Sequence, residues 1–168
     1  HTGWLANLRW TNSLESFGAD ANFDTIESQI MRAWTRSKST LSLALYYATT
    51  LEAQSNVQDY FPLGGFLRMS GRERGETAGP HAALARAVYY RRVGDSAGGL
   101  FELPVYLGAS LEAGNAWLSR GDISVDSLLM NGSIFAGFDA PIGPVYLAAG
   151  FGEGGETNVY LLIGSATR

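Results

Sequence analysis

The segment that decides the fold is residues 103–114, LPVYLGASLEAG. Apolar side chains alternate in it with small or polar ones, so that Val105, Leu107 and Leu111 share one face while Ser110 and Glu112 share the other. A period of two is typical of a β-strand with two different faces. The run is also long, because strands of soluble proteins usually have about 5–6 residues whereas a membrane-crossing strand needs about 9–11.

The same alternation recurs along the chain, in residues 4–11, 41–49, 82–93, 128–139, 145–151 and 157–165. Residues 22–35 are ambiguous, because Ile26, Ile30 and Trp34 fit a helix as well as a strand and Asp24 to Glu27 resembles a helix capping box. In this all-strand context we favour a strand. The sequence therefore predicts eight strands.

The expected connections alternate between short turns and long loops. Short ones fall at 37–39, 95–99 and 140–143, long ones at 12–21, 52–81 and 116–126, and only 153–156 is short where a long loop is due. Aromatic residues such as Trp4, Trp34, Trp117 and Phe138 lie near strand ends, where they suit interfacial girdles. Both features are typical of transmembrane β-barrels, so we predict an all-β, antiparallel transmembrane barrel.

Composition excludes several classes of protein. The 168 residues are 46% apolar and only 17% charged, whereas soluble domains are about 25% charged. An aromatic content of 12% argues against a disordered chain, and the 21 glycines show no collagen period. A net charge of −4 without a basic stripe gives no support for nucleic-acid binding. No apolar run is long enough for a transmembrane helix, and we interpret the chain, which begins at His1, as one piece of a longer protein.

No catalytic, cofactor or metal motif is present in the sequence. Cysteine is absent, and Gly108 to Glu112 lacks the last glycine of a nucleophile elbow. The two histidines, His1 and His81, have no ligand spacing, and we interpret His81 as a solvated loop residue rather than part of a catalytic triad. We therefore expect no bond chemistry, no cofactor and no metal in this chain.

Residues 61–81, FPLGGFLRMSGRERGETAGPH, form an unusually long connection. Phe61, Leu63, Phe66, Leu67 and Met69 are too apolar for a freely solvated loop. We expect this segment to fold into the barrel lumen, with packing on a neighbouring protein as the alternative. In the lumen, arginines of the loop would meet Glu112, whose parity places it opposite the lipid face.

Four motifs in residues 61–168 resemble, in the right order, the BamA/TamA/FhaC superfamily of outer-membrane barrels. Gly64-Gly65 and the tip Met69-Ser70-Gly71-Arg72 resemble its Gly-Gly and Val-Arg-Gly-Tyr/Phe loop; Tyr89-Tyr90-Arg91 resembles its Glu-Tyr-Arg strand; Leu111 to Trp117 resembles Phe-Asp-Ala-Gly-Asn-Val-Trp; and Pro141 to Val145 resembles its Pro-Leu-Gly-Pro hairpin. Residues 1–60 match only as barrel strands.

The amino-acid sequence of the loop and of residues 82–92 is most similar to that of the patatin-like phospholipases fused to such a barrel, the type Vd autotransporters. The resemblance implies that residues 1–168 are the C-terminal half of a sixteen-stranded barrel in a Gram-negative outer membrane. A patatin-like lipase passenger and a POTRA domain would precede it. It also implies contacts with lipid, with the rest of the barrel and with the outer-membrane assembly machinery, and leaves room for a homodimer.

The resemblance also implies a set of site residues. The loop motif falls on Gly64, Gly65, Arg68, Ser70, Gly71, Arg72, Arg74 and Gly75, and its wall partners on Glu112, Gly114, Tyr89 and Arg91. This chain departs from the family at the tip, where Ser70 replaces the arginine and Arg72 the aromatic residue, so we expect Arg72 or Arg74 to pair with Glu112. The last residues, Gly164 to Arg168, lack the family's terminal aromatic, so either the chain is trimmed or this member differs.

The alternation of side chains between the two faces of each strand leads to further expectations. Leu43, Leu45, Val105, Leu107, Leu147 and Leu161 should face lipid, and Tyr46, Ser110, Glu112 and Asn131 the lumen. Arg86 shares its parity with Leu84, Val88 and Tyr90, which we assign to the lipid side, where it would snorkel or meet a partner protomer. In a half barrel the first and last strands should not pair, so the isolated piece should aggregate or dimerise. The alternatives are a complete eight-stranded anchor barrel and a soluble ligand-binding β-barrel or β-sandwich.

Overall fold

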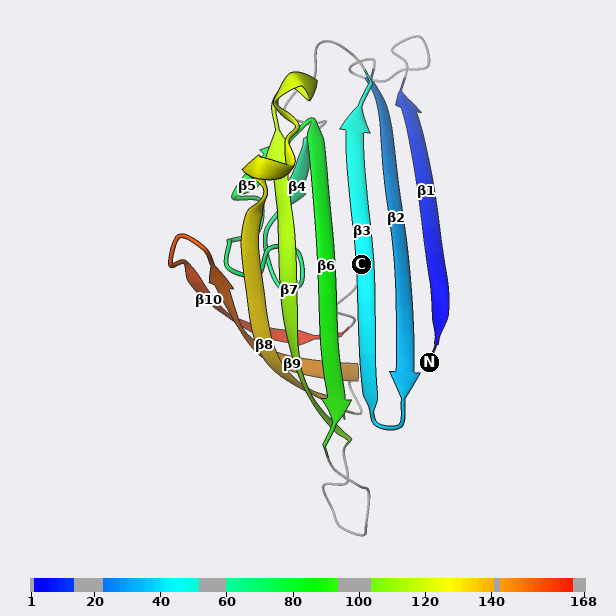
Figure 1. Ribbon diagram of the computed structural model, residues 1–168, viewed down its shortest axis with the longest axis vertical. Coiled ribbons are helices and arrows are strands. Elements are labelled where there is room, and N and C mark those ends of the chain that lie inside the picture. The colour runs from blue at the N-terminus through cyan, green and yellow to red at the C-terminus, as the bar shows by residue number, and fades with distance from the viewer. Residues whose placement is uncertain (1, 14–22, 52–59, 94–103, 141–142, 165–168) are drawn as a thin grey trace.

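The computed structural model describes residues 2–13, 23–51, 60–93, 104–140 and 143–164. Its main element is one antiparallel sheet whose eight strands follow each other in chain order (Figure 1). The strands are β1 (Gly3–Ser13), β2 (Phe23–Arg36), β3 (Ser39–Thr50), β6 (His81–Arg92), β7 (Val105–Trp117), β8 (Leu129–Ala140), β9 (Gly143–Gly152) and β10 (Thr157–Ile163). The predicted all-β fold is therefore confirmed. Of the ambiguous residues 22–35, those from 23 to 35 belong to a strand, β2, and residue 22 lies outside the described residues.

The connections add little regular structure. Between β3 and β6, the short strands β4 (Phe61–Leu63) and β5 (Thr77–Gly79) pair with each other. Between β7 and β8 lie two 3₁₀ turns, η3 (Arg120–Asp122) and η4 (Val125–Ser127). Within the described residues, no helix has the length and the apolar character needed to span a membrane.

The two faces of the sheet differ in what covers them. One face, which we call the loop face, carries residues 61–80, and its central side chains Ser110, Glu112, Asn131, Ser133 and Phe135 are buried. The opposite face, which we call the open face, carries large apolar side chains that no described residue covers. Its strongly exposed members include Leu8, Leu45, Leu111, Val159 and Leu161, each with 62–75% of its surface exposed.

The sheet coils strongly, so that β9 and β10 run across the direction of β1–β3 (Figure 1). Within the described residues, β1 pairs only with β2 and β10 only with β9. Both outer strands therefore leave one row of backbone groups without a strand partner among the described residues. This arrangement differs from a complete eight-stranded barrel, in which the first and last strands would be hydrogen-bonded.

The faces of β6 are the reverse of the prediction. Leu84, Arg86 and Val88 point to the loop face, where Leu84 and Val88 are buried, while Tyr89 is exposed on the open face. The physical reason is the register, which pairs Arg86 with Glu112 of β7 and Ala44 of β3, both on the loop face. Ala83, Ala85 and Ala87 of β6 thus occupy the open face, and the expectation that Arg86 faces lipid is wrong.

His81 is also placed differently from the expectation. It is the first residue of β6, is only 6% exposed, and its Nδ1 lies 2.8 Å from the hydroxyl of Thr49. Some expected features lie outside the described residues: the turn at 95–99, most of the loop at 12–21, residues 52–59 of the long connection, Pro141-Ile142 of the hairpin motif, and Ser165 to Arg168.

Candidate functional site: the folded loop and its carboxylate anchor

The loop at residues 61–80 folds back onto the sheet as a hairpin with a compact tip. Its stem is the pair β4–β5, in which Phe61 lies opposite Gly79 and Leu63 opposite Thr77. The stem lies beside β6 and β7 (Figure 1). Residues 64–76 between the two short strands form the tip, which lies on the loop face of the sheet.

The two glycines at the start of the tip close its neck. The Gly64 amide donates to the carbonyl of Arg68 at 2.7 Å, and the Gly65 amide donates to that of Arg72 at 2.9 Å. Both glycines have a positive φ, 120° and 98°, and a Cβ on Gly64 would lie 1.9 Å from the carbonyl oxygen of Glu73. The Gly-Gly pair is therefore required by backbone conformation and by a close approach.

Glu112 of β7 accepts four hydrogen bonds, three of them from the tip and one from Ser110 of its own strand. Its Oε2 accepts the backbone amides of Met69 at 2.6 Å and Ser70 at 2.7 Å, and its Oε1 accepts the hydroxyls of Ser70 at 2.7 Å and Ser110 at 2.5 Å. The side chain is only 1% exposed. Hydrogen bonds to an ionised carboxylate are short and strong, so this buried charge is stabilised by the loop backbone itself.

The expected ion pair between Glu112 and an arginine of the tip is wrong. Arg72 forms salt bridges with Glu76 at 2.9 Å and with Glu156 at 3.3 Å, whereas Arg74 is exposed. The reason is the conformation of the tip, in which Leu67 and Met69 have positive φ values of 60° and 78°. This turn points two successive amides at the carboxylate, so backbone donors take the place that we assigned to a guanidinium.

The end of the tip lies directly on β8, β9 and β10. Gly71 donates its amide to Asn131 Oδ1 at 3.2 Å and accepts at its carbonyl from Asn158 Nδ2 at 2.8 Å. The hydroxyl of Tyr160 donates to the carbonyl of Ser70 at 2.8 Å. A Cβ on Gly150 would lie 1.8 Å from that same carbonyl oxygen, so only glycine permits this approach.

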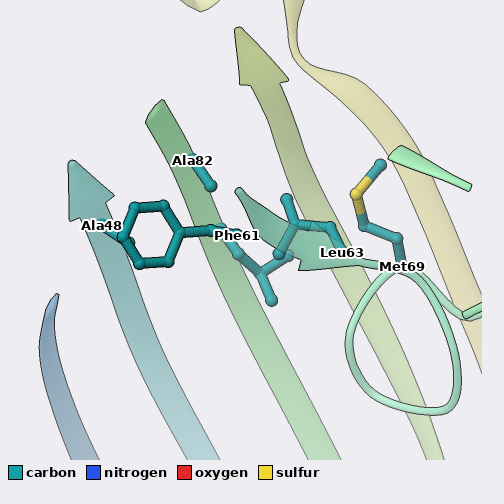
Figure 2. Close-up of a cluster of buried hydrophobic side chains, with 6 residues drawn as sticks. Ala48, Phe61, Leu63, Met69 and Ala82 are labelled. Atoms are coloured by element: carbon teal, nitrogen blue, oxygen red, sulfur yellow. The ribbon is translucent and has the colours of Figure 1, made fainter. Parts of the chain in front are cut away.

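Two apolar clusters hold the rest of the loop. In the first, side chains of the stem and tip pack on β3 and β6 (Figure 2), with the buried members Ala48, Phe61, Leu63, Met69, Ala82 and Leu84. The second is formed by Phe66, Leu67, Val88, Phe135 and Ala148. Within it the ring centroid of Phe66 lies 5.5 Å from that of Phe135 and 6.0 Å from that of Tyr160.

Two arginines join the loop to the sheet, one from a strand of the sheet and one from the loop. Arg86 of β6 donates from Nη1 to the carbonyl of Leu67 at 2.7 Å. Arg68 of the tip lies over the ring of Tyr46 on β3, with 5.1 Å between its guanidinium carbon and the ring centroid. The loop therefore makes contacts with every strand from β3 to β10 of the main sheet.

The structure brings together only part of the predicted site. Of the wall partners, Glu112 contacts the tip and Gly114 lies beside Leu84 on the loop face. Tyr89 lies on the open face, where its hydroxyl donates to Ser39, and Arg91 is exposed at the end of β6. Neither of the last two contacts the loop.

The sequence analysis missed several residues that hold the tip. Asn158 and Tyr160 alternate with Val159 and Leu161 in β10, so their parity could have indicated that they face the loop. Gly150 carried no comparable signal, because its role is to let the Ser70 carbonyl approach, and this depends on the docked position of the tip.

The arrangement supports a structural lock rather than acid–base chemistry. Both oxygens of Glu112 are occupied by donors from the loop and from Ser110, which leaves no oxygen free to take a proton from a substrate. Among the described residues, no group of three or more His, Cys, Asp or Glu side chains is placed to hold a metal ion.

Comparisons of the sequence with protein-family models and with curated proteins gave no match.

Proposed function

We propose that this chain is the C-terminal half of an outer-membrane β-barrel of the BamA/TamA/FhaC type, and that its folded loop occupies the lumen. Its role is to anchor, and to help translocate, an N-terminal patatin-like phospholipase passenger. Any lipase chemistry belongs to that passenger and not to the residues described above. The partners are outer-membrane lipid, the other half of the barrel, the POTRA domain and the barrel assembly machinery.

The observation that carries this proposal is the open face. Leu8, Leu45, Leu111 and Leu161 expose 62–75% of their surfaces from four strands of one sheet. Soluble monomers rarely expose a continuous apolar patch of more than a few hundred Å². A lipid bilayer supplies the missing apolar environment, and strands of 10–14 residues in β1–β9 of the main sheet are long enough to cross it.

The ends of the strands support the same orientation. Trp4 and Trp34 lie near one end of the open face, and Trp10 and Phe151 lie near the other. This distribution matches the two aromatic girdles of outer-membrane barrels. The turn at Ser37-Lys38 is short, whereas the segment that carries the folded loop and the η3–η4 connection both leave the sheet from the opposite end of the strands (Figure 1). Short turns are periplasmic in such barrels, so the long loops would be extracellular.

The loop supports the superfamily assignment at its tip. The family's tip arginine corresponds to Ser70, and the family's acidic wall residue corresponds to Glu112. These two residues contact each other, with Ser70 donating both its amide and its hydroxyl to the carboxylate. A contact between tip and wall at these two positions is what the proposed superfamily would require, here with serine as the donor in place of arginine.

A spin-label scan of β3 in the full-length protein tests the membrane location. This chain contains no cysteine, so each of the single substitutions Leu41→Cys, Leu43→Cys and Leu45→Cys introduces one spin label into it. We expect labels at Leu41, Leu43 and Leu45 to collide preferentially with oxygen, which concentrates in lipid, and Val125→Cys, 81% exposed beyond the sheet, to collide with a water-soluble reagent. Water-soluble reagent access at Leu43 and Leu45 would refute the proposal.

A protease-accessibility experiment tests the translocation role separately. In intact cells that produce the full-length protein, added protease should degrade the N-terminal passenger and leave the barrel. Protection of the passenger until the outer membrane is opened would show an anchor without translocation.

A further inference from the structure

The open face contains a groove that runs over β6, between apolar side chains of β3 and β7. Its volume is about 480 Å³, within the range of roughly 300–1,000 Å³ typical of small-molecule sites. Ala85 and Ala87 of β6 form its floor, Leu43 and Leu45 of β3 lie on one side, and Leu111 of β7 lies on the other. The groove arises because β6 presents alanines between strands that present leucines.

Arg32 of β2 lines one end of this groove. Its guanidinium carbon lies 4.6 Å from the ring centroid of Trp4 and 4.6 Å from that of Trp34. Among the described residues, none forms a salt bridge or a hydrogen bond with its guanidinium, in contrast to Arg72, which binds two glutamates. A cation with five N–H donors is thus held by aromatic rings at the edge of an apolar groove, without an anion.

The surroundings of Arg32 are basic. It lies four residues before Arg36, the last residue of β2, and so near the short-turn end of the sheet. The exposed residues Arg36, Arg91 and Arg92 lie at this same end, next to the turn that contains Lys38. The positive charges therefore gather where the apolar face ends.

We propose that this groove binds an anionic phospholipid, with one acyl chain over Ala85 and Ala87 and the headgroup phosphate on Arg32. The inference rests on the proposed function, because it requires the open face to lie in a bilayer with the short turns at the surface. A guanidinium binds phosphate oxygens with two parallel hydrogen bonds, and indole rings on its flank fix its position without competing for those donors. The adjacent bases favour a headgroup with a net negative charge.

Native mass spectrometry of the full-length protein, purified in detergent and titrated with phosphatidylglycerol or phosphatidylcholine, tests the site. Three variants are compared: Arg32→Gln removes the charge, Ala87→Leu fills the groove, and Arg91→Gln removes a base of the same rim outside the groove. We expect wild type to bind phosphatidylglycerol more tightly than phosphatidylcholine. Arg32→Gln should weaken phosphatidylglycerol binding about tenfold, because the free energy lost with a hydrogen bond to a charged group corresponds to about that change in Kd. Ala87→Leu should weaken binding of both lipids. Arg91→Gln removes one charge of the surrounding rim but no donor of the groove, so it should weaken phosphatidylglycerol binding by clearly less than Arg32→Gln.

Several results would overturn the lipid site while leaving the proposed function intact. These are equal binding by Arg32→Gln and wild type, an equal loss with Arg91→Gln, or a dimer that Ala87→Leu dissociates, which would show that a second copy covers the groove. The same preparations are assayed for insertion into phosphatidylcholine vesicles. Failure of wild type to insert would instead refute the membrane location itself.

Discussion

At the residue scale, Glu112 is a buried charge that the fold accommodates without a countercharge in contact. An unpaired charge away from water is costly, and the usual solution is an ion pair. Here four donors surround the carboxylate, two of them backbone amides of the loop tip. Docking of the tip and burial of the charge therefore depend on each other.

Replacing Glu112 with Gln should loosen the tip by about 1–3 kcal/mol, because hydrogen bonds to a charged group are lost and one acceptor oxygen becomes a donor. Hydrogen exchange at the amides of Met69 and Ser70 should accelerate about tenfold or more. Glu153→Gln, at an exposed carboxylate near β8, is the control. A charge swap with Arg72 should give no rescue, and a rescue would show that the ion pair exists in the protein.

Replacing Gly150 with Ala should displace the tip, because the new Cβ would lie 1.8 Å from the carbonyl oxygen of Ser70. Overpacking of this kind costs about 1–3 kcal/mol. Gly121→Ala is the matched control, since its nearest neighbour would be the Ser119 hydroxyl at 3.8 Å. Proteolysis of the loop should increase in Gly150→Ala alone, and equal protection of the two variants would mean that the tip does not lie on β9.

At the scale of elements, the loop and the sheet each supply what the other lacks. The tip alone could not bury Phe66, and the loop face without it would expose Phe135 and a carboxylate. Phe66 is 8% exposed and contacts Phe135, Tyr146 and Tyr160. These contacts join the loop to β8, β9 and β10 at once.

Phe66→Ala should remove about 3–5 kcal/mol of packing and release the tip from the loop face. If the loop fills the lumen of the complete barrel, this variant should also raise ion conductance through the full-length protein in planar bilayers. Glu73→Ala, at an exposed tip residue, should leave conductance unchanged. Unchanged conductance in Phe66→Ala would show that the loop does not obstruct the pore.

Elements also show how far the sequence could predict this structure. The alternation of apolar with small or polar residues predicts the eight strands. It also predicts the exposed leucines of β3, β7 and β10, because a period of two separates the side chains of the two faces of a strand. The prediction failed for β6. The large side chains of Leu84 and Val88 suggested that they face lipid, whereas they pack under the apolar side chains of the loop. It also failed for the partner of Glu112, because residue types reveal charged side chains but not the backbone amides that a strained turn exposes.

At the scale of the whole molecule, the sheet is curved and has two unpaired edges, β1 and β10. Barrels close such edges, and exposed edges template association. Residues 1–168 refolded alone in detergent should therefore form dimers or larger species, measured by light scattering. If, as we propose, another half of the barrel pairs with both edges, the longer protein should not associate through these strands. A monomeric, protease-resistant species from residues 1–168 would indicate that they close into a small barrel by themselves.

The open face is the feature of the whole molecule that most directly separates a membrane protein from a soluble one. Leu8 is 75% exposed at the middle of β1, so Leu8→Arg in the full-length protein should cost about 2–4 kcal/mol in a bilayer and reduce the folded, heat-modifiable fraction in the outer membrane. Val125→Arg is the matched control, because Val125 is 81% exposed but lies in η4, beyond the strands. If the open face were in water, the same Leu8→Arg change would remove no packing contact and should improve solubility. Opposite signs are therefore expected for the two environments, and a gain in folded yield for Leu8→Arg would contradict burial of this face in lipid.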